Sequence, residues 1–322
     1  MDLAELNRVA TAMVAPGKGI LAADESGGTI SKRFTAIGVE STETSRREYR
    51  ELLFRSAKAM TDRISGVILF DETIRQKAED GTKLVKVIEQ AGALPGIKVD
   101  KGAKPLAFCP GETITEGLDG LRERLVEYRE LGAKFCKWRA VIDIGPGIPS
   151  YTCISANAHA LARYAALCQE ENLVPIVEPE VLMDGDHDID RCVEVTEFVL
   201  KETFQQLYYQ RVPLEGIVLK PNMAVPGKKS AKKASVQEVA EKTVRMLKNC
   251  VPGAVPGIAF LSGGQSDGEA TAHLDAMNKI GGVPWRLSFS YGRALQAAPQ
   301  KAWSGNVENK TCLLYTSPSP RD

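Results

Sequence analysis

Short apolar runs alternate with amphipathic stretches along almost the whole chain. The apolar runs have the length of strands, and the stretches between them repeat apolar residues at helical spacing. The predicted strands cover residues 19–24, 66–71, 105–108, 133–138, 174–178, 216–220, 257–262 and 286–290. The predicted helices cover residues 1–14, 43–60, 82–91, 118–131, 155–171, 189–209, 236–249 and 268–279. Eight strands that alternate with helices predict one α/β domain, a (β/α)8 TIM barrel over residues 1–309.

Composition limits the classes of function. Of the 322 residues, 43% are hydrophobic and 25% are charged, which is typical of a globular protein. Lys plus Arg and Asp plus Glu number 41 each, so no charge excess points to nucleic acid or to a membrane surface. Residues 1–14 lack the continuous apolar core of a signal peptide, and we expect a cytoplasmic protein. No Gly-x-Gly-x-x-Gly follows the first strand, so a dinucleotide-binding sheet is not supported.

Metal and cofactor chemistry also lacks a signal. The seven cysteines are scattered and never form a C-x-x-C pair, which favours reduced packing residues. The three histidines are far apart, and no two have ligand spacing, so we expect neither a metal nor a cofactor. Lysines 228, 229, 232 and 233 indicate a solvated loop, with anion binding as the alternative. Aspartates 184, 186, 188 and 190 indicate capping of the following helix rather than a calcium loop.

A lysine ends one of the predicted buried strands. Residues 216–220 read Gly-Ile-Val-Leu-Lys, and Pro221 prevents simple continuation of the strand. Desolvation of the Lys220 ammonium at the mouth of an apolar strand favours the neutral amine, which is one condition for Schiff-base formation. The alternative is a lysine that extends its charged end to water. The ends of the other strands bear on this choice.

Charged residues stand at several other strand ends. Asp24, Lys137 and Glu178 each have a structural explanation alone, as a helix cap or as an ion pair at the barrel mouth. In a barrel, however, the carboxyl ends of all strands face one cavity, so these charges and Lys220 are expected to meet in a low dielectric. Lys220 would then be the nucleophile, Glu178 a proton shuttle, and Asp24 the acceptor of a proton from a substrate hydroxyl.

Two groups of residues are predicted to bind anions. The last two strands end in Ser-Gly-Gly and Ser-Tyr-Gly-Arg, which are turns with exposed amides and a guanidinium. Lys98, placed just before the predicted third strand, would hold a second anion with Arg33 and Ser26. An anion at each end and an amine between them imply a ketose bisphosphate, with an iminium rather than a metal stabilising the carbanion.

With these residues in view, the chain resembles class I, Schiff-base fructose-bisphosphate aldolases from about residue 3 to about residue 309. The matching segments are KGILAADES (18–26), IKVDKG (97–102), KWR (137–139), IVEPE (176–180), LKPNM (219–223), LSGGQ (261–265) and SFSYGRAL (288–295). The resemblance implies reversible cleavage of fructose 1,6-bisphosphate to dihydroxyacetone phosphate and glyceraldehyde 3-phosphate. It also implies a homotetramer with sugar phosphates as its small-molecule partners.

The resemblance assigns roles by position. It implies catalytic residues Lys220 (Schiff base), Glu178 (proton transfer), Asp24 (C4 hydroxyl), Lys137 (carbinolamine formation) and Glu180 (placement of nearby charges). The implied substrate- and phosphate-binding residues are Ser26, Arg33, Arg46, Lys98, Arg139, Ser262, Gly263, Gly264, Ser290, Gly292 and Arg293. Two other functions stay open: a non-catalytic barrel that binds sugar phosphates or cytoskeletal partners, and another Schiff-base aldolase or transaldolase.

Two segments depart from the family pattern. Residues 106–112 read LAFCPGE where the family usually has Gly-Thr-Asn-Gly-Glu, and Phe108 in this loop could alter packing or access. After residue 309 the family continues into another helix and a tail that ends in a tyrosine. Here the Ser/Pro-rich residues 310–322 read like a translated vector fragment, and Tyr315 does not match the tail motif. We expect a non-native, disordered end in place of that helix and tail.

Overall fold

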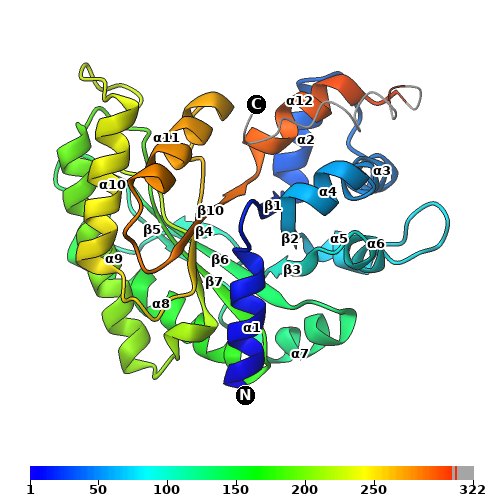
Figure 1. The fold of residues 1–322 in the computed structure, drawn as a ribbon, viewed down its shortest axis with the longest axis horizontal. Coiled ribbons are helices and arrows are strands. Elements are labelled where there is room, and N and C mark those ends of the chain that lie inside the picture. Colours follow the sequence, from blue (N-terminus) through cyan, green and yellow to red (C-terminus); the bar gives the residue numbers. More distant parts are fainter. Residues whose placement is uncertain (307–308, 310–322) are drawn as a thin grey trace.

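The computed structural model describes residues 1–306 and 309, and eight parallel strands form a closed barrel in it (Figure 1). The barrel strands are β1 (Gly19–Ala23), β2 (Ile64–Leu69), β3 (Leu94–Lys98), β6 (Phe135–Ile142), β7 (Val174–Val181), β8 (Val218–Leu219), β9 (Gly257–Phe260) and β10 (Arg286–Tyr291). They follow one another around the barrel in chain order, and β10 pairs with β1 to close it. The predicted (β/α)8 barrel is confirmed.

Helices surround the barrel and, in the case of the first helix, cover its amino end. They are α1 (Leu3–Met13), α2 (Gly27–Thr35), α3 (Glu43–Phe54), α4 (Ala57–Arg63), α5 (Asp71–Arg75), α6 (Leu84–Gln90), α7 (Leu121–Leu131), α8 (Tyr151–Glu170), α9 (Ile189–Tyr209), the short 3-10 helix η1 (Leu214–Gly216), α10 (Val236–Cys250), α11 (Asp267–Ile280) and α12 (Arg293–Trp303). The predicted helix over 43–60 is divided into α3 and α4. The sequence did not predict α2, which begins with two helix-breaking glycines, or α12, which contains Pro299. No helix within the described ranges is long and apolar enough to cross a bilayer.

The third strand was placed wrongly. It is β3, at residues 94–98, and not the predicted 105–108; Lys98 is therefore its last residue. Pro95 and Gly96 made this segment look like a turn. Both fit the barrel, since Pro95 offers only its carbonyl, to the amide of Lys134 at 2.8 Å, and Gly96 lies against the Phe135 ring. Residues 103–115 instead form the antiparallel hairpin of β4 (Ala103–Pro105) and β5 (Thr113–Thr115), and Phe108 lies fully exposed in the turn between them.

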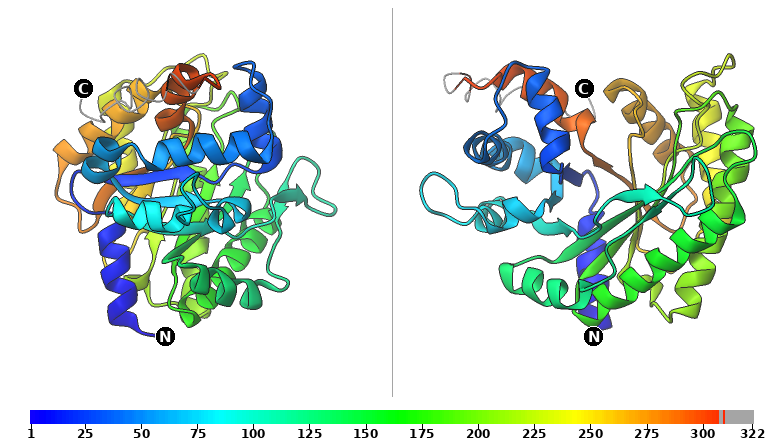
Figure 2. Two further views of the ribbon diagram at one scale, coloured as in Figure 1. Left: turned by 90° about the vertical axis from the view of Figure 1, so that its right-hand side faces the viewer. Right: turned by 180° about the vertical axis from the view of Figure 1, so that it is seen from behind.

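Apolar side chains fill the lower half of the barrel. Inward-facing residues of the strands form one cluster with Leu6, Val9, Ala10 and Met13 of α1. Figure 2 shows α1 (dark blue) standing below the strands in both views, where it covers the amino ends of the barrel. The outer faces of the strands pack under the helices in a second, larger cluster. Helix α1 covers the amino end of the barrel, and the charged residues lie at the carboxyl end.

The last described helix returns to the start of the chain. Trp303 of α12 packs against Phe34 and Tyr49, with ring centroids 5.4 and 5.2 Å away, and Figure 1 shows α12 beside α2. Buried Gln296 donates hydrogen bonds to the carbonyl of Ala22 (2.6 Å) and to Glu25 Oε1 (2.8 Å). These contacts fix the start of α12, and with it Arg293, beside the carboxyl end of β1. Residues 310–322, where a non-native tail was predicted, lie outside the described residues.

Candidate active site

Strand alternation sends charged side chains into the upper half of the barrel. Successive residues of a strand point to opposite faces, so a residue two positions after an inward apolar residue also points inward. Inward-facing Ala22, Phe135, Ile176 and Val218 belong to the interior cluster. Two positions after each of them stands a charged residue: Asp24, Lys137, Glu178 and Lys220, respectively. The apolar interior is thereby capped by a charged layer formed by these four residues.

Glu178 lies between the two lysines of this layer. Its Oε1 is 3.1 Å from Lys220 Nζ, and its Oε2 is 3.3 Å from Lys137 Nζ. All three residues are at least 95% buried. Oε2 is at ion-pair distance but makes no hydrogen bond, so one buried carboxylate oxygen is free to take up or deliver a proton. Lys220 is held in line with β7 by its amide, which donates to Val177 at 2.8 Å.

The charge of Asp24 and Lys137 is set by their pairing. Lys137 Nζ donates to Asp24 Oδ2 at 3.0 Å. Burial disfavours the charged form of Asp24, but the ammonium groups of Lys137 and Lys220 outweigh burial and lower the pKa of Asp24 to about 2. Burial alone would likewise lower the pKa of Lys137, yet the carboxylates of Asp24 and Glu178 raise it above its ordinary value. Lys137 is therefore an ammonium held by two carboxylates, whereas Lys220 contacts one.

Arg139 and Glu180 form an ion pair two residues further along β6 and β7 than Lys137 and Glu178. Glu180 is buried and Arg139 is partly exposed. Burial lowers the pKa of Arg139, but the neighbouring Glu180 more than compensates and raises it. Strands β6 and β7 continue beyond these residues. Lys137 and Arg139 therefore lie within β6, and Glu178 and Glu180 within β7, and not at the predicted strand ends.

One side of the charged layer opens into a cavity of about 350 Å³. Its wall is formed by the turn after β9 and by the junction of β10 with α12, which contribute Ser262, Gly263, Gly264, Ser290, Gly292 and Arg293. Ser290 Oγ is buried and has no hydrogen-bond partner, and Gly292 precedes the first turn of α12. A free hydroxyl, a guanidinium and the exposed amides of a glycine turn are suited to a phosphate group. All six predicted residues of this seat are brought together.

A second cavity, of about 850 Å³, adjoins the first and shares Arg33, Lys137 and Arg139 with it. Ser26, Asp24 and Lys98 also line it. The two cations predicted to hold the phosphate here already have anionic partners: Lys98 Nζ is 2.7 Å from Asp100 Oδ1, and Arg33 Nη1 is 2.5 Å from Glu25 Oε1. A phosphate here would have to share these cations with the carboxylates. Of the predicted phosphate ligands, Ser26, Arg33 and Lys98 are therefore placed together.

Arg46 is the predicted site residue that the fold does not bring to either cavity. It lies on α3 and makes a bidentate ion pair with Glu72, with bonds of 2.9 Å from Nε and 2.6 Å from Nη2. Buried Arg50 lies 3.4 Å from the same carboxylate. In this structure, Arg46 links α3 to α5.

Lys228 and Asp184 lie at the site although the sequence did not single them out. Lys228 was assigned to a solvated loop, with anion binding as the alternative; its side chain is about half exposed, and it also lines the cavity that contains Lys220 and Arg293. Asp184 lies opposite it, with Oδ1 2.5 Å from Lys228 Nζ. The available signal was position, since both residues stand on loops that leave the carboxyl ends of barrel strands, where functional residues gather. The neighbouring expectation was met: Asp188 caps α9 by accepting a hydrogen bond from the amide of Arg191.

A parallel barrel with buried lysines and carboxylates at its carboxyl end belongs to the class of TIM-barrel enzymes that act at this face. A family model described as class-I fructose-bisphosphate aldolase matches residues 5–313. The chain belongs to this family, as the resemblance predicted. The family consists of lyases, and its match favours an aldolase over a transaldolase.

Relatives and a solved structure agree with this family. A probable class 1 fructose-bisphosphate aldolase of Xanthomonas campestris pv. campestris is 60% identical, with 98% of this chain and 95% of that protein aligned. The relative named fructose-bisphosphate aldolase 6, cytosolic, of Arabidopsis thaliana is 57% identical over 91% of this chain and 82% of its own length. The structure of Plasmodium falciparum fructose-bisphosphate aldolase, solved with TRAP and a small-molecule inhibitor, has a TM-score of 0.95 and 48% identity, covering 97% and 90% of the two chains.

Proposed function

We propose that this protein cleaves fructose 1,6-bisphosphate reversibly to dihydroxyacetone phosphate and glyceraldehyde 3-phosphate through a Schiff base on Lys220. The observation that carries the proposal is the buried contact between Lys220 Nζ and Glu178 Oε1, beside the unbonded Oε2 of the same carboxylate. It places an amine and a proton carrier side by side where water is excluded. Membership of the aldolase family supports the reaction and the substrate.

The charged layer supports a division of roles in the first step. Lys220 passes a proton to Glu178 and attacks the C2 carbonyl as the neutral amine, which forms a carbinolamine. Glu178 returns a proton to the carbinolamine hydroxyl, and water leaves as the iminium forms. Lys137 stays protonated between Asp24 and Glu178, so it acts as a fixed positive charge rather than as a second nucleophile.

Carbon–carbon cleavage uses the same residues. Asp24 is ionised at neutral pH and accepts the proton of the C4 hydroxyl, so that the C3–C4 bond breaks and the aldehyde leaves. The electron pair of that bond moves into the iminium, which becomes an enamine. Return of that proton to C3 of the enamine leaves Asp24 ionised again, and hydrolysis of the regenerated iminium releases dihydroxyacetone phosphate and restores Lys220. Glu180 holds Arg139 at the rim of the site.

The two cavities support a bisphosphate with one phosphate at each end. We place the C1 phosphate at Ser262, Gly263, Gly264, Ser290, Gly292 and Arg293, and the C6 phosphate at Ser26, Arg33 and Lys98, with Arg139 between them. Arg46 would act indirectly, through the ion pair that orders α3 and α5.

The test is a steady-state cleavage assay. The purified chain should cleave fructose 1,6-bisphosphate with and without a chelator, because the proposed chemistry needs no metal and no group of three or more His, Cys, Asp or Glu in residues 1–306 could hold one. Lys220→Ala should lose at least about a thousandfold in kcat, since the covalent route is gone. Equal cleavage by wild type and Lys220→Ala, or loss of activity on chelation, would refute the proposal.

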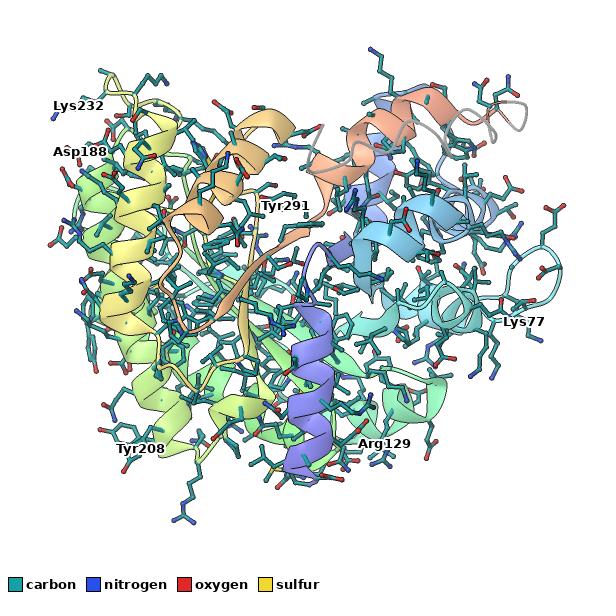
Figure 3. All side chains as sticks on the ribbon, viewed as in Figure 1. Lys77, Arg129, Asp188, Tyr208, Lys232 and Tyr291 are labelled. Carbon is teal, nitrogen blue, oxygen red and sulfur yellow. The ribbon has the colours of Figure 1, made fainter. Side chains whose placement is uncertain are left out.

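We also propose that the enzyme is cytoplasmic and assembles as a homotetramer. The cytosolic Arabidopsis relative supports the location. Exposed aromatic residues support assembly: Tyr151 and Phe198 stack on the outer side of α8 and α9, and Figure 3 shows Tyr208 at the lower edge of the molecule. Light scattering at assay concentration should give four times the chain mass of 34.9 kDa, and a monomer mass would contradict the tetramer.

A further inference from the structure

The loop between β8 and α10 is held against the loop that follows β7. The amides of Gly227, Lys228 and Lys229 donate to the carbonyls of His187 (2.8 Å), Met183 (2.7 Å) and Gly185 (3.0 Å), respectively. The two backbones are so close that a Cβ on Gly227 would lie 2.2 Å from the carbonyl oxygen of Gly185. Figure 3 shows Lys232 of this loop above Asp188 at the start of α9. The backbone of Lys228 is therefore fixed at the cavity by hydrogen bonds.

The side chain of Lys228 reaches the phosphate seat. A Cβ on Gly264 would lie 2.8 Å from Lys228 Nζ and 3.6 Å from Arg293 Nη2. Gly264 has φ +88°, a conformation that favours glycine, and the absence of a Cβ there lets Lys228 Nζ lie close to its backbone. An ammonium and a guanidinium thus approach the same backbone position, in the cavity that also contains the unbonded hydroxyl of Ser290.

The charges at this seat are not balanced. Arg293 forms no ion pair with any residue of the described ranges, and Lys228 has one partner, Asp184 Oδ1 at 2.5 Å. Lys228 and Asp184 are both about half exposed, and exposed ion pairs contribute little free energy. A phosphate dianion can therefore take the place of the carboxylate at small cost, and it would neutralise Lys228 and Arg293 together.

We infer that Lys228 is a phosphate-binding residue of the seat formed by Ser262, Gly264 and Arg293, and that Asp184 is the counterion which it exchanges for the phosphate of the sugar. The inference rests on the proposed function. It adds that Asp184 pairs with Lys228 when no phosphate is bound. The hydrogen bond and ion pair of the Lys228 side chain are with Asp184 and not with the reacting groups Lys220, Glu178 or Asp24. Its contribution is therefore to binding of the phosphate monoester and not to the chemical step.

Three variants test the inference, each compared with wild type for cleavage and for competitive inhibition by inorganic phosphate. Lys228→Met keeps the aliphatic stem and should raise both KM and the inhibition constant of phosphate roughly five- to tenfold, with kcat within about twofold of wild type. Lys229→Ala is the matched control, because its side chain is exposed and lines neither cavity, and both constants should be unchanged. Asp184→Asn removes the competing carboxylate and should lower the phosphate constant about two- to threefold.

The outcomes separate the two proposals. If wild type does not cleave the bisphosphate, the proposed function fails, and direct titration of wild type and Lys228→Met with inorganic phosphate still tests the binding residue. If wild type cleaves it and Lys228→Met has unchanged KM and phosphate affinity, Lys228 is not a phosphate ligand. A large fall in kcat alone, or weaker phosphate binding in Asp184→Asn, would equally overturn the inference.

Discussion

The ammonium of Lys137 and the carboxylate of Asp24 are hydrogen-bonded at 3.0 Å although their residues stand 113 positions apart. Asp24 follows β1 and Lys137 lies on β6, so the pair connects two strands across the barrel. Both side chains are largely buried, and water screens their attraction only weakly. The pair therefore stabilises the fold and also keeps Asp24 and Lys137 charged in the site.

The pair predicts a loss of stability in acid. The pKa of Asp24 is about 2 in the folded chain against an ordinary 3.8, so its ionised form stabilises the fold by about 2 kcal/mol. Because the folded pKa is the lower one, this stabilisation is present above pH 4 and is lost as the pH falls from about 4 to 2. The raised pKa of Lys137 reports the same attraction and is not added.

Urea unfolding from pH 7 to pH 2.5 measures this contribution. Wild type should lose about 1.4 kcal/mol more between pH 4 and pH 2.5 than Asp24→Asn, which has no carboxylate to protonate. Asp275→Asn is the control, since its pair with Lys279 is exposed on α11 and should leave the acid slope unchanged. The same acid slope in wild type and Asp24→Asn would contradict the account of this pair.

Replacing Gly96 by alanine is expected to disturb packing at the third strand, β3. A Cβ on Gly96 would lie 2.2 Å from the ring of Phe135, which is itself fixed in the barrel interior. Gly96→Ala should therefore destabilise the fold by about 2 kcal/mol or more, measured by urea unfolding at pH 7. Gly28→Ala is the control, because nothing lies within 4 Å of its added Cβ in α2. If Gly96→Ala were as stable as Gly28→Ala, the placement of β3 would be wrong.

The segment around Gly96 is the one barrel strand that the sequence did not predict. Seven of the barrel strands were found because each is an apolar run between amphipathic helices. The strand at 94–98 was missed because Pro95 and Gly96 are local turn signals. Both residues fit a strand only because of their contacts with Lys134, just before β6, and with Phe135 of β6. Information of that kind is tertiary and cannot be read from the segment alone.

The candidate site was predictable to the extent that strands position it. Asp24, Lys137, Glu178 and Lys220 follow from the periodicity of strands that meet in one barrel. Arg46 and Lys228 do not, because their placement depends on helix packing and on the path of a loop. Helix α3 turns Arg46 toward Glu72, and backbone hydrogen bonds to the loop after β7 bring Lys228 to the cavity.

Replacing Phe108 by glycine is expected to stabilise the fold. Phe108 has φ +61° and is fully exposed in the turn of the β4–β5 hairpin, so its ring contributes no packing to offset the left-handed backbone. Phe108→Gly should stabilise the fold by about 0.5 kcal/mol, seen as a rise in Tm. Phe108→Ala keeps the strained backbone and should not reproduce the gain. Destabilisation by Phe108→Gly would show that the ring has a packing role.

The identity of the nucleophile is tested most directly by trapping the covalent intermediate. Wild type is incubated with dihydroxyacetone phosphate, reduced with borohydride, digested and analysed by mass spectrometry. We expect one reduced adduct, on Lys220, which is absent from Lys220→Ala. Lys137 should stay unmodified in both, because Asp24 and Glu178 hold it as an ammonium. No adduct in wild type, or an adduct on Lys137 that persists in Lys220→Ala, would contradict the assignment of Lys220 as the Schiff-base lysine.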